Sequence, residues 1–246
     1  MNELFLSDDL IFYTIEGEGR YVGYPSVFMR LSMCNLTCQG FKSKDSPFGC
    51  DSFASWSVKN KMTFNEIFAI LDKNGYIEHL KNGAIFKITG GEPFIQQKAL
   101  LEFMKAFVQR YEFRPIIDFE TNGTIMPDED WINLFGASFT VSPKLTNNGD
   151  PEEKRYKPEV LRQHVSYSSC FKFVVRNRAD VEEIIARYIK EPSINVPTSM
   201  VWLMPCCGSR QEQAQVSAEV AELCKEYRLI FSPRLHLMIW DKALKV

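Results

Sequence analysis

The sequence lacks the features that mark several classes of protein. Its 29 Lys and Arg against 31 Asp and Glu give a formal net charge of −2, without the basic excess of proteins that bind nucleic acid through its phosphates. The three histidines are too few for a histidine-rich metal site. No apolar run reaches membrane-spanning length, and the N-terminus has no signal-peptide pattern. We therefore expect a cytoplasmic protein that binds neither nucleic acid nor a membrane.

The composition is that of an ordinary globular protein. Of the 246 residues, 45% are hydrophobic and 24% are charged, which argues against disorder and suits one large α/β domain over residues 1–246. Helical periodicity, the first instance beginning with a capping box at Thr63 and Glu66, predicts helices at 63–71, 97–110, 179–190 and 211–227. Short apolar runs predict strands at 26–33, 84–89, 115–121, 138–142, 170–175, 200–204 and 234–240.

Strands that alternate with helices predict a parallel sheet joined by right-handed crossovers. Seven predicted strands are too few for a complete eight-stranded barrel. The expected fold is therefore a partial, TIM-like βα barrel, and the alternative is a doubly wound sheet. In both folds ligands bind at the carboxyl ends of the strands, which is where the polar motifs of this sequence stand.

Three of the seven cysteines are grouped. Cys34, Cys38 and Cys50 directly follow the predicted strand 26–33, and no fourth cysteine occurs before Cys170. Thiolates are soft ligands for zinc or iron–sulfur clusters, and three of them leave one coordination position open. An odd number of cysteines also argues against a full disulfide framework. The alternatives are a zinc-stabilised binding module or three unrelated cysteines in a core and a loop.

A second motif, Gly90-Gly91-Glu92-Pro93, ends the predicted strand 84–89. Glycine has no β-carbon, so paired glycines allow a ligand to approach the backbone closely. The cysteine group and this motif, in this order, resemble the CxxxCxxC and GGEP motifs of the radical S-adenosylmethionine superfamily. The resemblance implies that the three cysteines hold a [4Fe–4S] cluster whose unique iron binds S-adenosylmethionine. It also implies that the GGEP strand end binds the amino group of that cofactor.

Within this superfamily, residues 12–38 resemble the N-terminus of the 7-carboxy-7-deazaguanine synthases. Further matches to that family run to the end of the chain, at 50–52, 89–93, 120–124, 142–144, 203–205 and 234–236. The resemblance implies the conversion of 6-carboxy-5,6,7,8-tetrahydropterin to 7-carboxy-7-deazaguanine with loss of ammonia, a step of queuosine biosynthesis. It implies no side chain acting as acid or base, because the radical comes from the cluster-bound cofactor.

The same resemblance assigns individual residues. Substrate contacts are expected from Ile15, Glu16, Gly17, Arg30, Thr89 and His236. Contacts with S-adenosylmethionine are expected from Gly49, Cys50, Asp51, Gly91, Glu92, Ser142, Pro143, Lys144, Met204, Pro205, Cys206 and Cys207. Arg30 also stands out in the sequence itself, because it interrupts an apolar strand and its fork suits a carboxylate. The other reading is an arginine on a solvated face.

The sequence departs from the family pattern between its second and third cysteines. Eleven residues separate Cys38 from Cys50, where the family usually has two, so the cluster-binding loop 34–50 carries an insertion. Lengthening a loop this much costs roughly 1.5 kcal/mol, and metal–thiolate bonding contributes on the order of ten kcal/mol. Asp51 and Ser52 match the family's Cys-Asp-Thr and favour Cys50 as a ligand. Serine keeps the oxygen of threonine, so Mg²⁺ binding at Ser52 is expected to survive.

The remaining histidines and cysteines are expected to be structural. His79 and His164 fall in polar stretches and are expected at the surface, and Cys170 and Cys224 fit core positions. His236 lies in the predicted strand 234–240, where it either faces the substrate or belongs to the core. The resemblance also implies a homodimer and an external, flavodoxin-like electron donor. A radical activating enzyme that installs a glycyl radical on a partner is the alternative within the superfamily.

Overall fold

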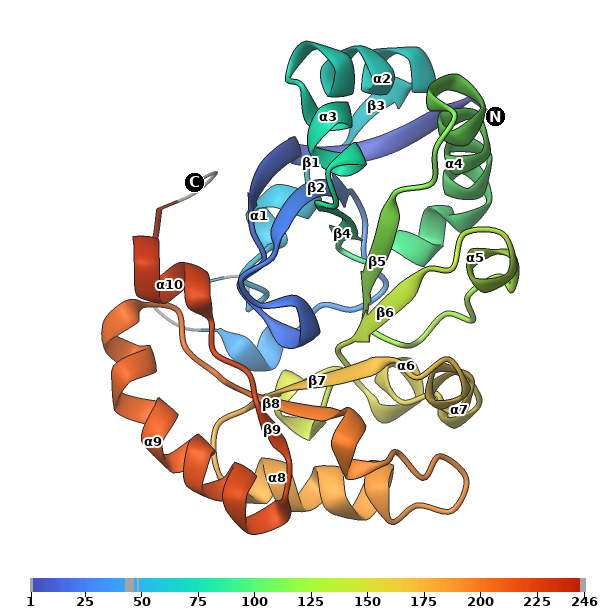
Figure 1. Cartoon of the computed structure of the whole chain (residues 1–246). Helices are drawn as coiled ribbons and strands as arrows, with labels where there is room; N and C mark the ends of the chain where they lie inside the picture. Colours follow the sequence, from blue (N-terminus) through green and yellow to red (C-terminus); the bar gives the residue numbers. More distant parts are fainter. Residues whose placement is uncertain (1, 43–46, 48, 244–246) are drawn as a thin grey trace.

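One curved sheet organises the computed structural model, which describes residues 2–42, 47 and 49–243 (Figure 1). The strands are β1 (Glu3–Ile15), β2 (Pro25–Leu31), β3 (Asn60–Thr63), β4 (Ile85–Gly90), β5 (Ile116–Thr121), β6 (Ser138–Val141), β7 (Cys170–Val175), β8 (Val201–Pro205) and β9 (Ile230–Phe231). Their order in the sheet is β3-β1-β2-β4-β5-β6-β7-β8-β9. All neighbours from β2 to β9 are parallel, and β1 is antiparallel to both β2 and β3.

The strand order decides between the two expected architectures. From β2 to β9, each strand joins the sheet beside the strand that precedes it in the chain, apart from β3 at the far edge. A doubly wound sheet instead reverses its order at a switch point, so that alternative is wrong. The chain is a single-domain α/β fold with a mostly parallel sheet, and Figure 1 shows helices α2 to α9 around the outside of the curve.

The four predicted helices are confirmed, with small shifts at their ends. The α-helices are α1 (Phe53–Trp56), α2 (Phe64–Lys73), α3 (Tyr76–Lys81), α4 (Gln97–Tyr111), α5 (Asp130–Asn133), α6 (Glu152–Arg155), α7 (Pro158–Ser166), α8 (Arg178–Ile184), α9 (Arg210–Tyr227) and α10 (Leu235–Trp240). Shorter 3₁₀ helices are η1 (Gly19–Tyr21), η2 (Gln39–Phe41), η3 (Pro93–Gln96), η4 (Thr146–Asn148) and η6 (Thr198–Met200), and η5 (Ile185–Ile189) is a π-helical turn that extends α8. The capping box is present: the Thr63 hydroxyl accepts from the Glu66 N–H, and the Glu66 carboxylate accepts from the Thr63 N–H.

Alternation along the parallel strands separates the two faces of the sheet. One face packs against the outer helices and is apolar, with buried residues that include Val27, Met29, Phe86, Ile88, Ile117, Phe119, Phe139, Phe171 and Phe173. Successive side chains of a strand point to opposite faces, so the residues between these belong to the other face. We call this second face the inner face. It carries Arg30, Lys87, Thr89, Asp118, Glu120 and Lys172.

The predicted strand 234–240 is wrong. Residues 230–231 pair with β8 instead, Pro233 lacks the N–H that a continuing strand needs, and the chain turns into α10. Its six residues leave Leu237 buried but Met238 52% exposed, so the apolar run belongs to a short half-buried helix. The sequence did not predict strand β1, because Ser7 and Asp8 interrupt its apolar pattern. In the structure, the pairing of β1 with β2 shifts register in the same stretch.

His79 and His164 were both expected at the surface, and the structure places them differently. His164 is fully buried in α7, where its ring packs 5.1 Å from that of Phe139, and burial lowers its pKa to about 3. The surface prediction for this residue is wrong because α7 packs the His164 side of its surface against the sheet. His79 is partly buried and stacks on Tyr13 at 4.0 Å. Cys170 and Cys224 are buried, as predicted. Among the described residues, no helix combines the length and apolar character needed to cross a membrane.

Candidate active site

The cysteine loop follows β2, and its long insertion is closed at its base. Gly49 has φ +94°, and a β-carbon there would lie 2.4 Å from the carbonyl oxygen of Cys38. Only glycine can come this close in this conformation. The two ends of the eleven-residue segment between Cys38 and Cys50 therefore meet, which brings the second and third cysteines together despite the insertion. Residues 43–46 and 48 of the insertion lie outside the described residues.

Asp150 fixes the middle of this loop. Its carboxylate accepts hydrogen bonds from the N–H of Cys38 (2.8 Å), from the hydroxyl of Thr37 (2.7 Å) and from the amide of Asn148 (2.8 Å). Asp150 follows η4, and the backbone of Gly40 packs directly on that same turn. The segment after β6 therefore holds the cysteine loop in place through Asp150 and the turn before it.

Each of the three sulfurs accepts a hydrogen bond from a side-chain N–H. The pairs are Trp56 with Cys50 at 3.4 Å, Asn148 with Cys38 at 3.5 Å and Asn122 with Cys34 at 4.0 Å. Burial raises the pKa of all three thiols, that of Cys34 to about 12. Thiolates at these positions need a nearby positive charge, which a metal centre supplies on binding while the thiol protons are released.

The chemistry of the three donors suits a soft metal centre. Thiolates bind zinc and iron–sulfur clusters, and three of them leave one coordination position open. Within residues 2–42, 47 and 49–243, no three His, Cys, Asp or Glu side chains form a group that could hold a single ion.

The glycine pair after β4 approaches the end of β2. A β-carbon on Gly90 would lie 2.2 Å from the carbonyl oxygen of Leu31, and one on Gly91 would lie 2.1 Å from that of Met33 and 2.7 Å from the β-carbon of Cys34. The missing side chains thus let two backbones meet, whereas the sequence predicted a close approach to a ligand. The contact places Gly91 directly against the first cysteine.

Glu92 links this glycine pair to the next loop. Its fully buried carboxylate accepts from the N–H groups of Phe94 (3.1 Å) and Asn122 (2.7 Å) and from the hydroxyl of Thr121 (2.9 Å). Burial raises the pKa of Glu92 to about 7, although these hydrogen bonds lower it. With both oxygens occupied, Glu92 holds the loop after β4 to the loop after β5.

Residues 142–144 stand at the same edge of the sheet, after β6. The ammonium of Lys144 donates to the carbonyl oxygen (2.8 Å) and the hydroxyl (2.9 Å) of Ser142, and Pro143 lies between them. Burial raises the pKa of Cys38, and the positive charge of Lys144 acts against that rise. Lys144 is therefore close enough to the cysteine loop to favour negative charge there.

Within the sheet, the inner face carries a buried ion group around Lys87 of β4. Its ammonium lies 2.6 Å from Asp118 and 2.9 Å from Glu16, and all three side chains are less than a tenth exposed. Asp118 also accepts from the hydroxyls of Ser138 and Thr140. Burial raises the pKa of Glu16, and Lys87 opposes that rise.

A second buried ion group surrounds Lys172, which donates to Glu18 and Glu120. Arg234 bridges this group to the cysteine loop, because its guanidinium lies 2.9 Å from Glu18 and 2.9 Å from Asp51. Burial raises the pKa of Glu120, but the positive charges of Lys172 and Lys87 together outweigh it and bring the pKa to about 2. A continuous row of charges thus joins the inner face to the residue that follows Cys50.

Several residues predicted to contact substrate lie beside this row of charges. Arg30 and Thr89 are register partners on β2 and β4, so their side chains share the inner face, and Thr89 donates to Glu120 at 3.2 Å. His236 belongs to α10 and not to a strand, yet its ring reaches the same place. A β-carbon on Gly17 would lie 2.2 Å from Nδ1 of His236.

Ile15 ends β1 opposite Pro25, the first residue of β2. The segment after Ile15 therefore starts at the end of the sheet away from the cysteines, not at a carboxyl end of the parallel strands. From there Glu16 and Glu18 reach Lys87 and Lys172 across the inner face.

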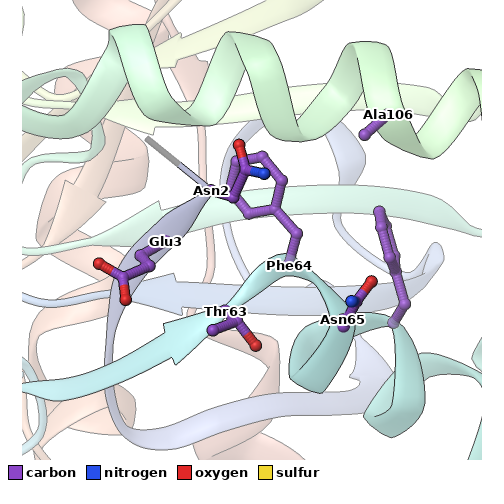
Figure 2. Close-up of a pocket in the computed structure, with 7 residues that line it drawn as sticks. Asn2, Glu3, Thr63, Phe64, Asn65 and Ala106 are labelled. Carbon is purple, nitrogen blue, oxygen red and sulfur yellow. The ribbon is translucent and has the colours of Figure 1, made fainter.

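A hollow of about 700 Å³ lies elsewhere (Figure 2). It is lined by Asn2, Glu3, Thr63, Phe64, Asn65, Phe68 and Ala106, which come from the start of β1, the beginning of α2 and the second half of α4. Glu3, the charged side chain of this lining, pairs with Lys61 at 2.8 Å. The hollow has none of the grouped ionic side chains of the inner face, so we place the active site on the inner face and the cysteine loop.

Comparison with known proteins identifies the family of the chain. Residues 15–131 match the family model of a 4Fe-4S single cluster domain. The 7-carboxy-7-deazaguanine synthase of Hyperthermus butylicus is 30% identical over 237 residues, which cover 93% of this chain and 90% of that protein. The synthase of Halobacterium salinarum is also 30% identical, over 95% of this chain and 90% of that protein. The chain belongs to the 7-carboxy-7-deazaguanine synthase family. In fold it is similar to QueE from Escherichia coli, with a TM-score of 0.60 and 22% identity over 94% of this chain and 95% of that one.

In this member of the 7-carboxy-7-deazaguanine synthase family, three ionic residues of the inner face were not expected from the sequence. Lys87, Asp118 and Lys172 each interrupt an apolar strand at a position that faces away from the helices. That signal is the same one that singled out Arg30. It identifies a charged residue on the inner face, but not which partner lies opposite.

The predicted cofactor contacts at the end of β8 and in the loop after it bond to other parts of the protein. The N–H of Cys206 donates to the carbonyl oxygen of Val175 at 2.9 Å, and the carbonyl oxygen of Cys207 accepts from Arg234. Met204 and Pro205 are the last residues of β8. Ser52 precedes α1, and its hydroxyl donates to Asp51 at 3.1 Å. The assignment of these residues to a cofactor or to Mg²⁺ stays a prediction.

Proposed function

We propose that this chain is the radical S-adenosylmethionine enzyme that converts 6-carboxy-5,6,7,8-tetrahydropterin to 7-carboxy-7-deazaguanine with loss of ammonia. The observation that supports it most is the charged row on the inner face, which leads from Glu120 on β5 through Lys172, Glu18 and Arg234 to Asp51, directly after Cys50. Such a row offers polar partners for a small polar substrate, whereas a radical activating enzyme acts on a partner protein. Membership of the synthase family supports the same choice.

Cys34, Cys38 and Cys50 would hold the [4Fe–4S] cluster. Their sulfurs share one loop, each faces an N–H donor, and their three thiolates leave one iron open for S-adenosylmethionine. When bound, the cluster supplies the electron that cleaves S-adenosylmethionine and so provides the radical for the reaction. The protein residues hold these groups in place and exclude water.

The edge beside the cysteines would hold S-adenosylmethionine. Gly91 touches Cys34, and Lys144 with Ser142 faces the same loop. The proposed contacts from this edge are Gly49, Cys50, Asp51, Gly91, Glu92, Ser142, Pro143, Lys144, Met204, Pro205, Cys206 and Cys207.

The inner face would hold the substrate. Arg30 offers a planar, always charged fork for the substrate carboxylate. Glu16 is a buried carboxylate that can accept the N–H groups of the pterin ring, and Gly17 lets His236 pack close beside it. Thr89 and Ile15 complete the proposed contacts. Mg²⁺ on the Ser52 hydroxyl would neutralise part of the substrate carboxylate charge.

The proposal extends to the architecture and the surroundings of the chain. We infer that the curved sheet is the incomplete βα barrel of the radical S-adenosylmethionine type, and that the segment 34–50 after β2 is its cluster-binding loop. A homodimer, an external flavodoxin-like electron donor and a cytoplasmic location belong to the same proposal.

The test is a turnover assay under anaerobic conditions. The reconstituted protein is incubated with dithionite, S-adenosylmethionine, Mg²⁺ and carboxytetrahydropterin, and 7-carboxy-7-deazaguanine is measured by mass spectrometry. Product that depends on both S-adenosylmethionine and reductant supports the proposal. A protein with an intact cluster that cleaves S-adenosylmethionine but forms no product would overturn the substrate assignment.

A further inference from the structure

Trp56 makes the best-defined hydrogen bond to any of the three sulfurs. Its indole has a single N–H, which is a donor only, and this N–H points at the sulfur of Cys50 from 3.4 Å. The amides of Asn148 and Asn122 also donate to oxygen atoms, at 2.8 Å to Asp150 and 2.9 Å to Asn35. Within the described part of the chain, the indole hydrogen is directed at the sulfur alone.

The backbone fixes the position of the indole. The carbonyl oxygen of Trp56 accepts from the N–H of Met33, the residue before Cys34, at 3.1 Å. Its N–H donates to the carbonyl oxygen of Ser52 at 3.0 Å, and its ring meets the edge of the Phe53 ring at 5.0 Å. Trp56 is thus tied to both sides of the cysteine loop, independently of its contact with sulfur.

We propose that Trp56 is a positioning residue that raises the reduction potential of the cluster through its hydrogen bond to Cys50. This inference rests on the cluster ligation proposed above. Reduction adds one electron, and part of the added negative charge falls on the ligand sulfurs. An N–H directed at such a sulfur stabilises the more negative state, so it favours the reduced cluster.

The ring of Trp56 also borders a hollow of about 220 Å³, lined further by Thr37, Gln39, Lys42, Pro47 and Phe53. Three of these lining residues, Gln39, Lys42 and Pro47, belong to the segment between Cys38 and Cys50 that carries the insertion. These described residues of the segment therefore border the hollow beside the indole that donates to Cys50.

The variant Trp56→Phe keeps an aromatic ring and removes the N–H. Both it and the unaltered protein are reconstituted, their iron is counted, and their clusters are titrated potentiometrically with detection by electron paramagnetic resonance. We expect W56F to hold the same iron at a more negative midpoint, by up to a tenfold change in the reduced-to-oxidised ratio, which is about 59 mV for one electron. The matched control Trp240→Phe, at the end of α10, should keep the original midpoint.

Pulsed resonance on the reduced, unaltered protein gives a second readout that needs no variant to fold. With ¹⁵N-labelled indole, we expect a coupling from one indole nitrogen. Equal midpoints in W56F and the unaltered protein, or no indole coupling, would overturn the role of Trp56 alone. An unaltered protein that takes up no iron–sulfur cluster would instead overturn the proposed function.

Discussion

Gly49 lies against Cys38 so closely that a β-carbon on it would be 2.4 Å from the Cys38 carbonyl oxygen. This contact joins the ends of the insertion and sets the separation of two proposed cluster ligands. We expect Gly49→Ala to lose most of its iron after reconstitution, because the clash moves Cys50 away from Cys38. The measurement is iron and sulfide per chain.

Gly83→Ala is the matched control for this variant. Gly83 has nearly the same backbone conformation, with φ +92°, but nothing lies within 4 Å of the point that a β-carbon would occupy. The control therefore shares the conformational strain and lacks the clash. Equal iron retention by the two variants would show that the contact between Gly49 and Cys38 does not shape the site.

Lys172 is expected to stabilise the fold through its two carboxylate partners. Lys172→Met removes the ammonium that contacts Glu120 and leaves Glu18 with Arg234 alone, which should lower the free energy of unfolding by about 3 kcal/mol, the lower end for a broken buried pair. Urea denaturation of the apoprotein measures this change. Lys225→Met removes an exposed lysine paired with Glu222 and should leave stability unchanged. Similar stability of the two variants would contradict the role of the buried group.

Glu92 predicts a pH dependence of stability. Burial raises its pKa from 4.5 to about 7, so between these values the folded protein keeps a proton that the unfolded chain has lost. The raised pKa therefore adds to the free energy of unfolding. This contribution is fully present below about pH 4.5, and it decreases by up to about 3 kcal/mol as the pH rises through about 7. Glu92→Gln is uncharged throughout, so its unfolding free energy should lack this fall. Parallel pH profiles of the two proteins would contradict the assignment.

Arg30 is expected to act on substrate binding and not on folding. Arg30→Lys keeps the charge but loses the planar fork, and hydrogen bonds to charged groups contribute about 1.5–3 kcal/mol. We expect kcat/KM for the carboxytetrahydropterin to fall roughly ten- to hundredfold, mostly through KM. Arg178→Lys, at an exposed pair with Glu226, should keep the original kinetics. An unchanged KM in R30K would remove Arg30 from the substrate site.

Much of the fold could be predicted because its signals are local. Periodicity locates α2, α4 and α9 within a few residues, and the strand interrupted by Arg30 correctly indicates a polar inner face. The strand predicted at 234–240 is wrong because a short apolar run suits a strand or a half-buried helix equally well. Only pairing with β8 decides which segment forms the last strand.

The arrangement of the site could be predicted only in part. The cysteine group and the glycine pair are visible in the sequence, since each is a short motif. The partnership of Lys172 with Glu18 is not, because the two residues are far apart in the chain and meet only when the segment after β1 crosses the inner face. Pairings of this kind depend on the tertiary fold, and no local pattern encodes them.

Cys34, Cys38 and Cys50 are proposed to hold a catalytic cluster despite the insertion. The most direct measurement is iron content together with 7-carboxy-7-deazaguanine formation in Cys50→Ala, with Cys224→Ala in α9 as the control. We predict about four irons per chain and product for the unaltered protein and C224A, and loss of both in C50A. A C50A variant that keeps its cluster and still forms product would show that Cys50 is not a ligand of the catalytic cluster.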